Sequence, residues 1–180
     1  KRKGDVTVTI YAGAGKASIT PPIGTPLSGY MAKDRVATGI HDAIYARVIA
    51  VKHGDDCSVI ISLDLLCIDR VYTEQFTNRV STRYRIPAEN VFIHATHTHS
   101  GPGGNMADTA IVNKAFPYLN GRMSYDESIV QAQHEQMMKA VEEALSSLEP
   151  CEVRYGESEV HGVALNRNSP DQPHDPKLRV

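Results

Sequence analysis

Ser58-Val59-Ile60-Ile61-Ser62-Leu63-Asp64 and Val91-Phe92-Ile93-His94-Ala95 bound the stretch that decides the fold. Between these two apolar runs, Tyr72, Phe76, Val80 and Tyr84 recur every four residues, which is the spacing of one helical face. The pattern predicts a strand, a helix and a second strand, and such units hold their strands parallel with a right-handed crossover. Ligands of open α/β sheets bind beyond the carboxyl ends of the strands, where Asp64, His97 and His99 lie in this sequence.

The segment before this unit predicts the rest of a sheet. Val6 to Ala12 alternates apolar and polar side chains, which indicates a half-buried first strand, and Gly13-x-Gly15 is typical of a turn at a strand end. Ala43 to Val51 is a second apolar run, and the turn residues 53–56 separate it from residues 58–63, which predicts an antiparallel hairpin. We therefore expect an α/β fold with a mixed β-sheet and flanking helices.

The second half of the chain contains the strongest helix signal. Ser124 and Glu127 have the spacing of a capping box, and a stripe at helical spacing follows them, formed by Val130, Met137, Met138, Val141, Leu145 and Leu148. Pro150 is expected to end this helix, and residues 152–155, 160–165 and 176–180 are predicted as further strand segments. A chain of 180 residues is expected to form a single domain over residues 1–180, or a piece of one.

Composition excludes several classes of protein. The formal net charge is −2, from 19 basic and 21 acidic residues, and no basic block is long enough to follow a phosphate backbone, so we expect no nucleic-acid partner. No apolar run approaches the roughly 20 residues of a transmembrane helix, and no signal-peptide pattern follows the first five residues. Cys57, Cys67 and Cys151 are too scattered for a disulfide framework, so we expect buried free thiols.

The run Ala95-Thr96-His97-Thr98-His99-Ser100-Gly101-Pro102-Gly103-Gly104 contains the candidate chemistry. In an extended segment His97 and His99 leave the same face of the backbone and can approach one metal ion or one substrate, whereas His94 has the opposite parity and is expected to pack behind its strand. Spacing alone leaves metal binding open. The three glycines among residues 101–104 predict a tight, exposed turn with close backbone approach to a ligand, although a turn without function has the same composition.

Other metal and nucleotide motifs fail on this chain. A dinuclear His-x-His-x-Asp-His pattern would need Asp and His where Gly101 and Pro102 stand. A phosphate-binding loop would need a hydroxyl residue where Ala17 follows Gly15-Lys16.

The stretch Thr96 to Gly104 resembles the signature of the neutral and alkaline non-lysosomal ceramidases. Further segments have family-like counterparts in the same order, namely residues 14–22, 28–31, 39–41, 62–64 and 166–170. The resemblance covers nearly the whole chain. It implies the N-terminal portion of a longer catalytic domain, because family members carry a second His, a Glu, a Tyr and an active-site Ser in later motifs that this chain lacks. The missing ligands would come from such a continuation or from another chain.

The resemblance also implies roles for individual residues. His97 would bind a catalytic Zn²⁺, and His99 would donate a hydrogen bond to the substrate carbonyl oxygen. Arg167 would be a second donor to that oxygen, although it could instead be a solvated cation. Ser100, Gly101, Gly103 and Gly104 would form the active-site loop. Asp64 could accept the outward N–H of a zinc-bound imidazole or could cap the following helix.

The implied function is zinc-dependent hydrolysis of a linear amide. Zinc-activated water would cleave N-acylsphingosine (ceramide) to fatty acid and sphingosine. The implied partners are a small, lipid-like amide substrate and the remainder of the catalytic domain, and the resemblance places the protein outside the cell or at a membrane surface. Alternatives are a metallohydrolase for a different amide, with one or two metal ions, and a catalytically inactive binding domain of the same fold.

Overall fold

The computed structural model describes residues 9–30, 35–106, 125–163, 166, 168–169 and 171–180. Residues 1–150 and residues 151–180 form two compact units, each of which is described by itself. Whether both belong to one catalytic domain stays a prediction.

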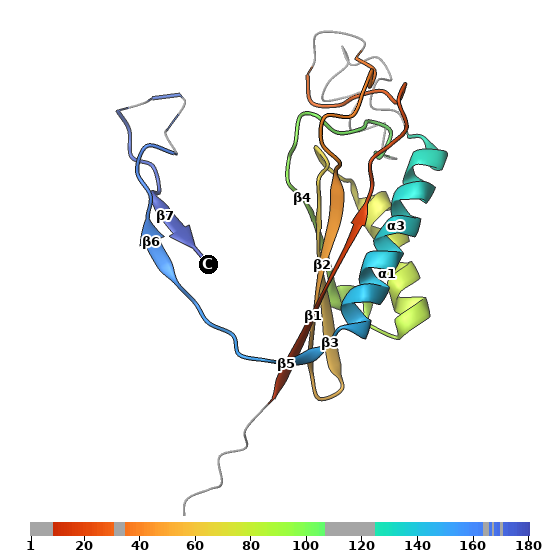
Figure 1. Ribbon diagram of the computed structural model, residues 1–180, viewed down its shortest axis with the longest axis vertical. Helices are drawn as coiled ribbons and strands as arrows, with labels where there is room; N and C mark the ends of the chain where they lie inside the picture. Colours follow the sequence, from red (N-terminus) through yellow and green to blue (C-terminus); the bar gives the residue numbers. More distant parts are fainter. Residues whose placement is uncertain (1–8, 31–34, 107–124, 164–165, 167, 170) are drawn as a thin grey trace, which may run out of the picture. The chain divides into compact units, whose positions relative to one another are not determined.

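The first unit is built on a mixed β-sheet with the strand order β4-β3-β2-β1-β5 (Figure 1). Its strands are β1 (Ile10–Ser18), β2 (Tyr45–His53), β3 (Asp56–Leu63), β4 (Val91–Ala95) and β5 (Glu149–Cys151). Strands β1 and β3 both run antiparallel to β2, and β4 runs parallel to β3. The predicted hairpin and the predicted strand-helix-strand unit are therefore both confirmed.

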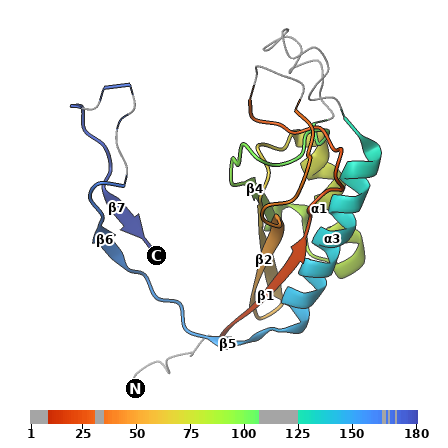
Figure 2. The same cartoon turned by 45° about the horizontal axis from the view of Figure 1, so that its top comes forward.

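Two helices cover one face of this sheet, as Figures 1 and 2 show. They are α1 (Arg70–Tyr84) and α3 (Glu127–Ser146), and a short 3-10 helix, η1 (Ala88–Asn90), leads into β4. The inward side chains of β2 and β3 are apolar at every second position, so they make the core with the helices: Ala46, Val48, Ala50, Val59, Ile61 and Leu63. Tyr72, Phe76 and Val80 of α1 and Met137, Ala140 and Val141 of α3 complete this core.

The first strand differs from its prediction. It starts at Ile10 and continues to Ser18, so Gly13 and Gly15 lie inside β1 and do not form a turn at its end. A Cβ atom on Gly13 would lie 2.0 Å from the carbonyl oxygen of Ala144, and one on Gly15 would lie 2.0 Å from that of Ala140. These glycines let the backbone of α3 lie directly on the strand. Part of the predicted strand, residues 6–8, lies outside the described residues.

The helix boundaries also correct two predictions. The carboxylate of Asp126 accepts hydrogen bonds from the backbone N–H groups of Ser128 and Ile129, so Asp126 is the N-cap of α3. The predicted capping residue, Ser124, lies outside the described residues. The helix ends at Ser146, before Pro150, which lies in β5. None of the described helices is both long enough and apolar enough to cross a membrane.

The second unit contains a small antiparallel ribbon of β6 (Glu157–Glu159) and β7 (Lys177–Arg179). Glu157 forms ion pairs with Lys177 and Arg179 across this ribbon. Strand β7 confirms the prediction for residues 176–180. The predictions for residues 152–155 and 160–163 are wrong, because those residues are not in strands, and residues 164–165 lie outside the described part of the chain.

The cysteines are free, but they are less buried than predicted. Cys57 and Cys67 are half-buried, and burial raises the pKa of both thiols. Cys151 is exposed, so its prediction as a buried thiol is wrong.

Candidate functional site

The two histidines of the central motif face each other on the loop after β4. Their Nε2 atoms are 3.3 Å apart and their rings meet edge to face. The segment is not extended as predicted, because His97 has a φ angle of 64°. The Nδ1 atom of His97 lies 2.9 Å from the carbonyl oxygen of Leu66. Since that oxygen can only accept a hydrogen bond, Nδ1 carries the proton and the Nε2 lone pair points toward His99.

This arrangement fits part of a zinc site. A metal-binding imidazole usually donates its second ring N–H to a carbonyl or carboxylate, as Nδ1 of His97 does here. Two nitrogens on one tetrahedral zinc lie about 3.3 Å apart, although this separation also suits a hydrogen bond between the two rings. The described residues contain no group of three His, Cys, Asp or Glu side chains that could hold a metal ion. They can therefore supply only part of a ligand set.

A strap of residues 25–29 holds the histidine loop in place. The backbone N–H of Ser28 donates to the carbonyl of Gly101, and its hydroxyl donates to the carbonyl of Pro102 at 3.0 Å. The N–H of Gly103 donates to the carbonyl of Pro26, and Leu27 forms a β-bridge with Pro102. These contacts connect segments more than 70 residues apart, so the position of the loop depends on the strap.

Gly29 and Tyr30 touch His99 directly. Gly29 has a φ angle of 101°, and a Cβ atom on it would lie 2.6 Å from the Cα atom of His99. The ring of Tyr30 meets the imidazole of His99 edge to face at 5.3 Å between centroids. Sequence reasoning gave no role to Ser28, Gly29 or Tyr30, although this tripeptide was one of the segments that carried the resemblance.

The glycine turn is buried, so the prediction of an exposed turn is wrong. Gly101, Gly103 and Gly104 are buried and Ser100 is exposed. Gly104 has a φ angle of 88°, and a Cβ atom on it would lie 3.1 Å from Asp126 at the start of α3. Its carbonyl accepts the N–H of Asp126 at 2.7 Å. The absence of a side chain at Gly104 therefore lets the loop pack against the start of α3.

Asp64 has other partners than the predicted ones. Its carboxylate accepts hydrogen bonds from Arg47 at 2.8 Å and from the backbone N–H of Tyr45 at 2.9 Å. Asp69 is the N-cap of α1, so the helix-cap alternative for Asp64 is wrong. The His97 ring forms its hydrogen bond with the backbone carbonyl of Leu66 and not with the carboxylate of Asp64. Asp64 therefore stabilises the ends of β2 and β3, beside the loop.

The two remaining candidates take different positions. His94 is exposed on the face of the sheet away from the helices, so the prediction that it packs behind its strand is wrong. Arg167 lies outside the described residues.

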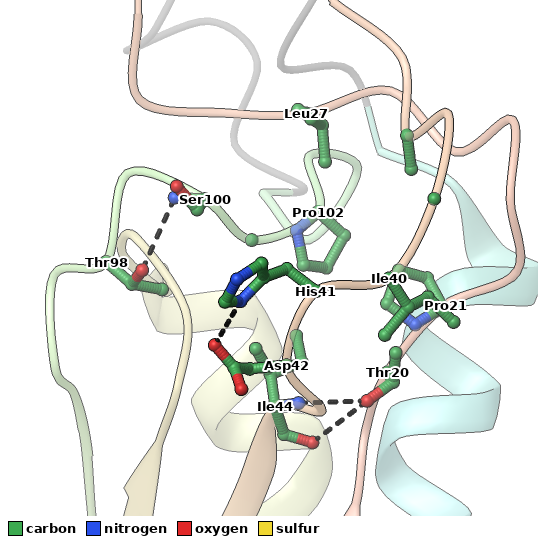
Figure 3. Close-up of a pocket in the computed structure, with 13 residues that line it drawn as sticks. Thr20, Pro21, Leu27, Ile40, His41, Asp42, Ile44, Thr98, Ser100 and Pro102 are labelled. Atoms are coloured by element: carbon green, nitrogen blue, oxygen red, sulfur yellow. Dashed lines mark hydrogen bonds and ion pairs between the residues drawn. The ribbon is translucent and has the colours of Figure 1, made fainter.

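A pocket of about 450 Å³ lies against the same loop (Figure 3). Thr98, Ser100 and Pro102 line it from the loop, and its apolar lining also includes Leu27, Ile40 and Ile44. His41 lines this pocket with Asp42, and its Nδ1 atom lies 2.6 Å from the Asp42 carboxylate. The sequence analysis gave these two residues no role in the site.

Comparison with known proteins decides the family. The model of the neutral/alkaline non-lysosomal ceramidase N-terminal domain matches residues 11–177. The chain belongs to this ceramidase family. It is 32% identical to neutral ceramidase 2 of Arabidopsis thaliana over 143 residues, and 27% identical to neutral ceramidase of Pseudomonas aeruginosa over 161 residues. These alignments cover 72% and 87% of the chain.

The fold is also that of the ceramidases. The crystal structure of the Pseudomonas aeruginosa neutral ceramidase superposes with a TM-score of 0.82 and 26% identity, over 96% of this chain. The match covers only 29% of that crystal chain, and the two sequence alignments cover 18% and 23% of the relatives. The chain thus spans less than a third of the length of these relatives.

Proposed function

We propose that this chain is part of the active site of a zinc-dependent amidase that hydrolyses N-acylsphingosine to fatty acid and sphingosine. His97 would be a zinc ligand, and His99 and Arg167 would donate hydrogen bonds to the carbonyl oxygen. One observation carries the proposal: Nε2 of His97 faces Nε2 of His99 at 3.3 Å while Nδ1 is held by the Leu66 carbonyl. Both imidazoles are thus presented from one loop at the carboxyl edge of the sheet.

The residues of this chain would bind the substrate and stabilise charge. Zinc, when bound, would lower the pKa of a water molecule toward about 7 and polarise the carbonyl. Hydrolysis would add the oxygen of water to the carbonyl carbon and break the C–N bond, and a proton of that water would leave on the amine nitrogen. Negative charge develops on the carbonyl oxygen during this step, so donors such as His99 and Arg167 would stabilise it. The strap, through Gly29, would fix the position of His99.

The pocket supports a lipid-like substrate. Leu27, Ile40 and Ile44 give its wall an apolar surface, and Pro102 connects this wall to the histidine loop. An apolar pocket with a few polar groups at one side is typical of a site for an amphipathic small molecule. An alkyl chain of the substrate would enter this pocket while its amide lies beside the histidines.

Product analysis with the complete enzyme tests the proposal. We expect the protein encoded by the complete reading frame to bind one zinc ion per active site and to release fatty acid and sphingosine from ceramide in equal amounts. Zinc content is measured by elemental mass spectrometry and the products by chromatography. Two zinc ions per site, or cleavage of other amides but not of ceramide, would favour a different metallohydrolase. Zinc binding with no hydrolysis of any N-acyl substrate would favour an inactive binding domain.

Replacement of His99 separates its role from metal binding. The variant His99→Ala should keep zinc but lose about 10²-fold to 10³-fold in kcat, as expected when one donor to a developing oxyanion is removed. Loss of zinc from this variant would instead make His99 a metal ligand.

A further inference from the structure

The face of the sheet opposite the helices carries a continuous apolar row. Ala14, Ile49, Ile60 and Phe92 are direct neighbours across four adjacent strands, because Ala14 pairs with Ile49, Ile49 with Ile60, and Ile60 with Phe92. The exposed fractions are 51% for Ile49, 43% for Ile60 and 61% for Phe92. Neighbouring side chains on one face of a sheet lie about 5 Å apart. The row is therefore one contiguous patch and not a set of isolated apolar residues.

The next row toward the histidine loop is polar. Lys16 pairs with Arg47, Arg47 with Ser62, and Ser62 with His94. Arg47 also forms the ion pair with Asp64 at the end of β3. An antiparallel sheet face that is exposed to water normally carries polar side chains throughout. Here the polar side chains are concentrated near the site, and the large apolar ones lie one row away from it.

We propose that the remainder of the ceramidase catalytic domain covers this apolar row with an apolar layer of its own. The relatives supply the argument for this occupant, because the matched part is an N-terminal domain and accounts for only 29% of the crystal chain that it superposes on. Burial of three large apolar side chains favours such packing. Within the described residues of the first unit, the hydrophobic core lies on the helix-covered face of the sheet.

A layer over the apolar row would also lie close to the histidine loop. The polar row and the histidine loop follow each other at the carboxyl edge of β3 and β4. A layer that ends over the polar row would bring its own side chains to this edge. Zinc ligands beyond His97 would then come from the layer that buries Ile49, Ile60 and Phe92. The proposal rests on family membership and not on the chemistry of His97.

Thiol labelling of the complete enzyme tests the covered face directly. In the variant Ile60→Cys, we expect a maleimide to react at least about 100-fold more slowly with the folded protein than with the urea-unfolded protein, because a packed side chain reacts only after local opening. The parent enzyme gives the background from its native cysteines, which include Cys57, Cys67 and Cys151. Asn78→Cys, on the exposed surface of α1, is the matched control, with Ile49→Cys as a second probe of the row.

The outcomes separate this proposal from the proposed function. Slow labelling of Ile60→Cys and Ile49→Cys at all protein concentrations supports the proposal even in a protein without zinc or activity. Labelling of Ile60→Cys within about threefold of its unfolded rate would overturn it, because the side chain would then be exposed. Protection that disappears on dilution to a monomer would also overturn it, since a second copy would then be the occupant.

Discussion

Gly29 is the residue where backbone conformation and the candidate chemistry meet. It has a positive φ angle, and the space that a side chain would need is filled by His99. Gly24, on the same segment, also has a positive φ angle, but a Cβ atom there would meet nothing within 4 Å. Comparison of alanine variants at Gly29 and Gly24 therefore separates the effect of backbone strain from the effect of displacing His99.

Replacing Gly29 by Ala should impair catalysis more than stability. A shift of about 1 Å in a catalytic group can cost about 100-fold in rate, so we expect a loss of that order in kcat for Gly29→Ala. Gly24→Ala should lose only the stability that a positive φ angle costs an alanine, which is less than Gly29→Ala loses, and should keep its activity. Steady-state kinetics and thermal unfolding of the complete enzyme measure both effects. Equal kinetics for the two variants would show that Gly29 does not position His99.

His134 is a residue whose burial should make stability depend on pH. Its side chain is fully buried against Tyr72 and Phe76, and neither ring nitrogen has a hydrogen-bond partner among the described residues. Burial, and secondarily the charge of Arg79, lowers the pKa of His134 from 6.5 to about 4. The folded state therefore holds His134 neutral at a pH where the unfolded chain binds a proton.

Acid should weaken the fold through this residue. Stability from neutral His134 is fully present above pH 6.5 and decreases as the pH falls toward about 4. From these two pKa values, the loss at pH 5 is about 2 kcal/mol. We expect the variant His134→Leu to show a smaller loss between pH 7 and pH 5 in urea unfolding. The same pH dependence in both proteins would contradict this account of His134.

At the scale of single residues, the candidate catalytic residues His97 and His99 were easier to predict from the sequence than the contacts of the residues around them. His97 and His99 stand out because imidazoles and glycines follow the apolar run of residues 91–95. The partners of Asp64 were not predictable, because Arg47 is adjacent only through the register of β2 and β3. His94 was assigned by parity to the packed side of its strand, but its side chain is exposed among the described residues.

At the scale of elements, the contact between β1 and α3 depends on two glycines. Gly13 and Gly15 give α3 a flat surface, and the backbone N–H of Lys16 donates to Glu143 of the helix at 2.9 Å. Sequence periodicity predicted α1, α3 and the hairpin, because each of them is locally amphipathic. It placed β1 too early, since the small residues in the second half of this strand carry no period-two signal.

An alanine at Gly15 should destabilise the protein strongly. Its Cβ atom would overlap the carbonyl of Ala140, which cannot move without shifting α3, so we expect a loss of about 3 kcal/mol or more. Gly39→Ala is the control, because a Cβ atom there meets nothing within 4 Å and the φ angle is not positive. The midpoint of urea unfolding measures both variants. A loss below about 1 kcal/mol for Gly15→Ala would mean that α3 does not lie this close to β1.

At the scale of the whole molecule, the proposed function makes the chain a scaffold that carries part of an active site. A catalytic zinc normally has three protein ligands, and the proposed role of His97 supplies one of them. The sequence predicted this shortfall from the resemblance alone. It could not predict the open apolar face, because that face appears only when β1 to β4 are in register.

The chain of residues 1–180 on its own should therefore be inactive. We expect no hydrolysis of ceramide above the background of a buffer control, measured by release of fatty acid under conditions where the complete enzyme is active. Robust hydrolysis by the purified 180-residue chain would show that it contains a sufficient set of catalytic groups.

The most direct test of the account compares two histidines three residues apart in the complete enzyme. Zinc content and ceramide hydrolysis are measured for His97→Ala and for His94→Ala, which removes an exposed imidazole from the same segment. The account predicts that His97→Ala loses the zinc and at least about 100-fold in kcat/KM, while His94→Ala keeps its zinc and turnover. A His97→Ala enzyme with full zinc content and undiminished turnover would contradict it.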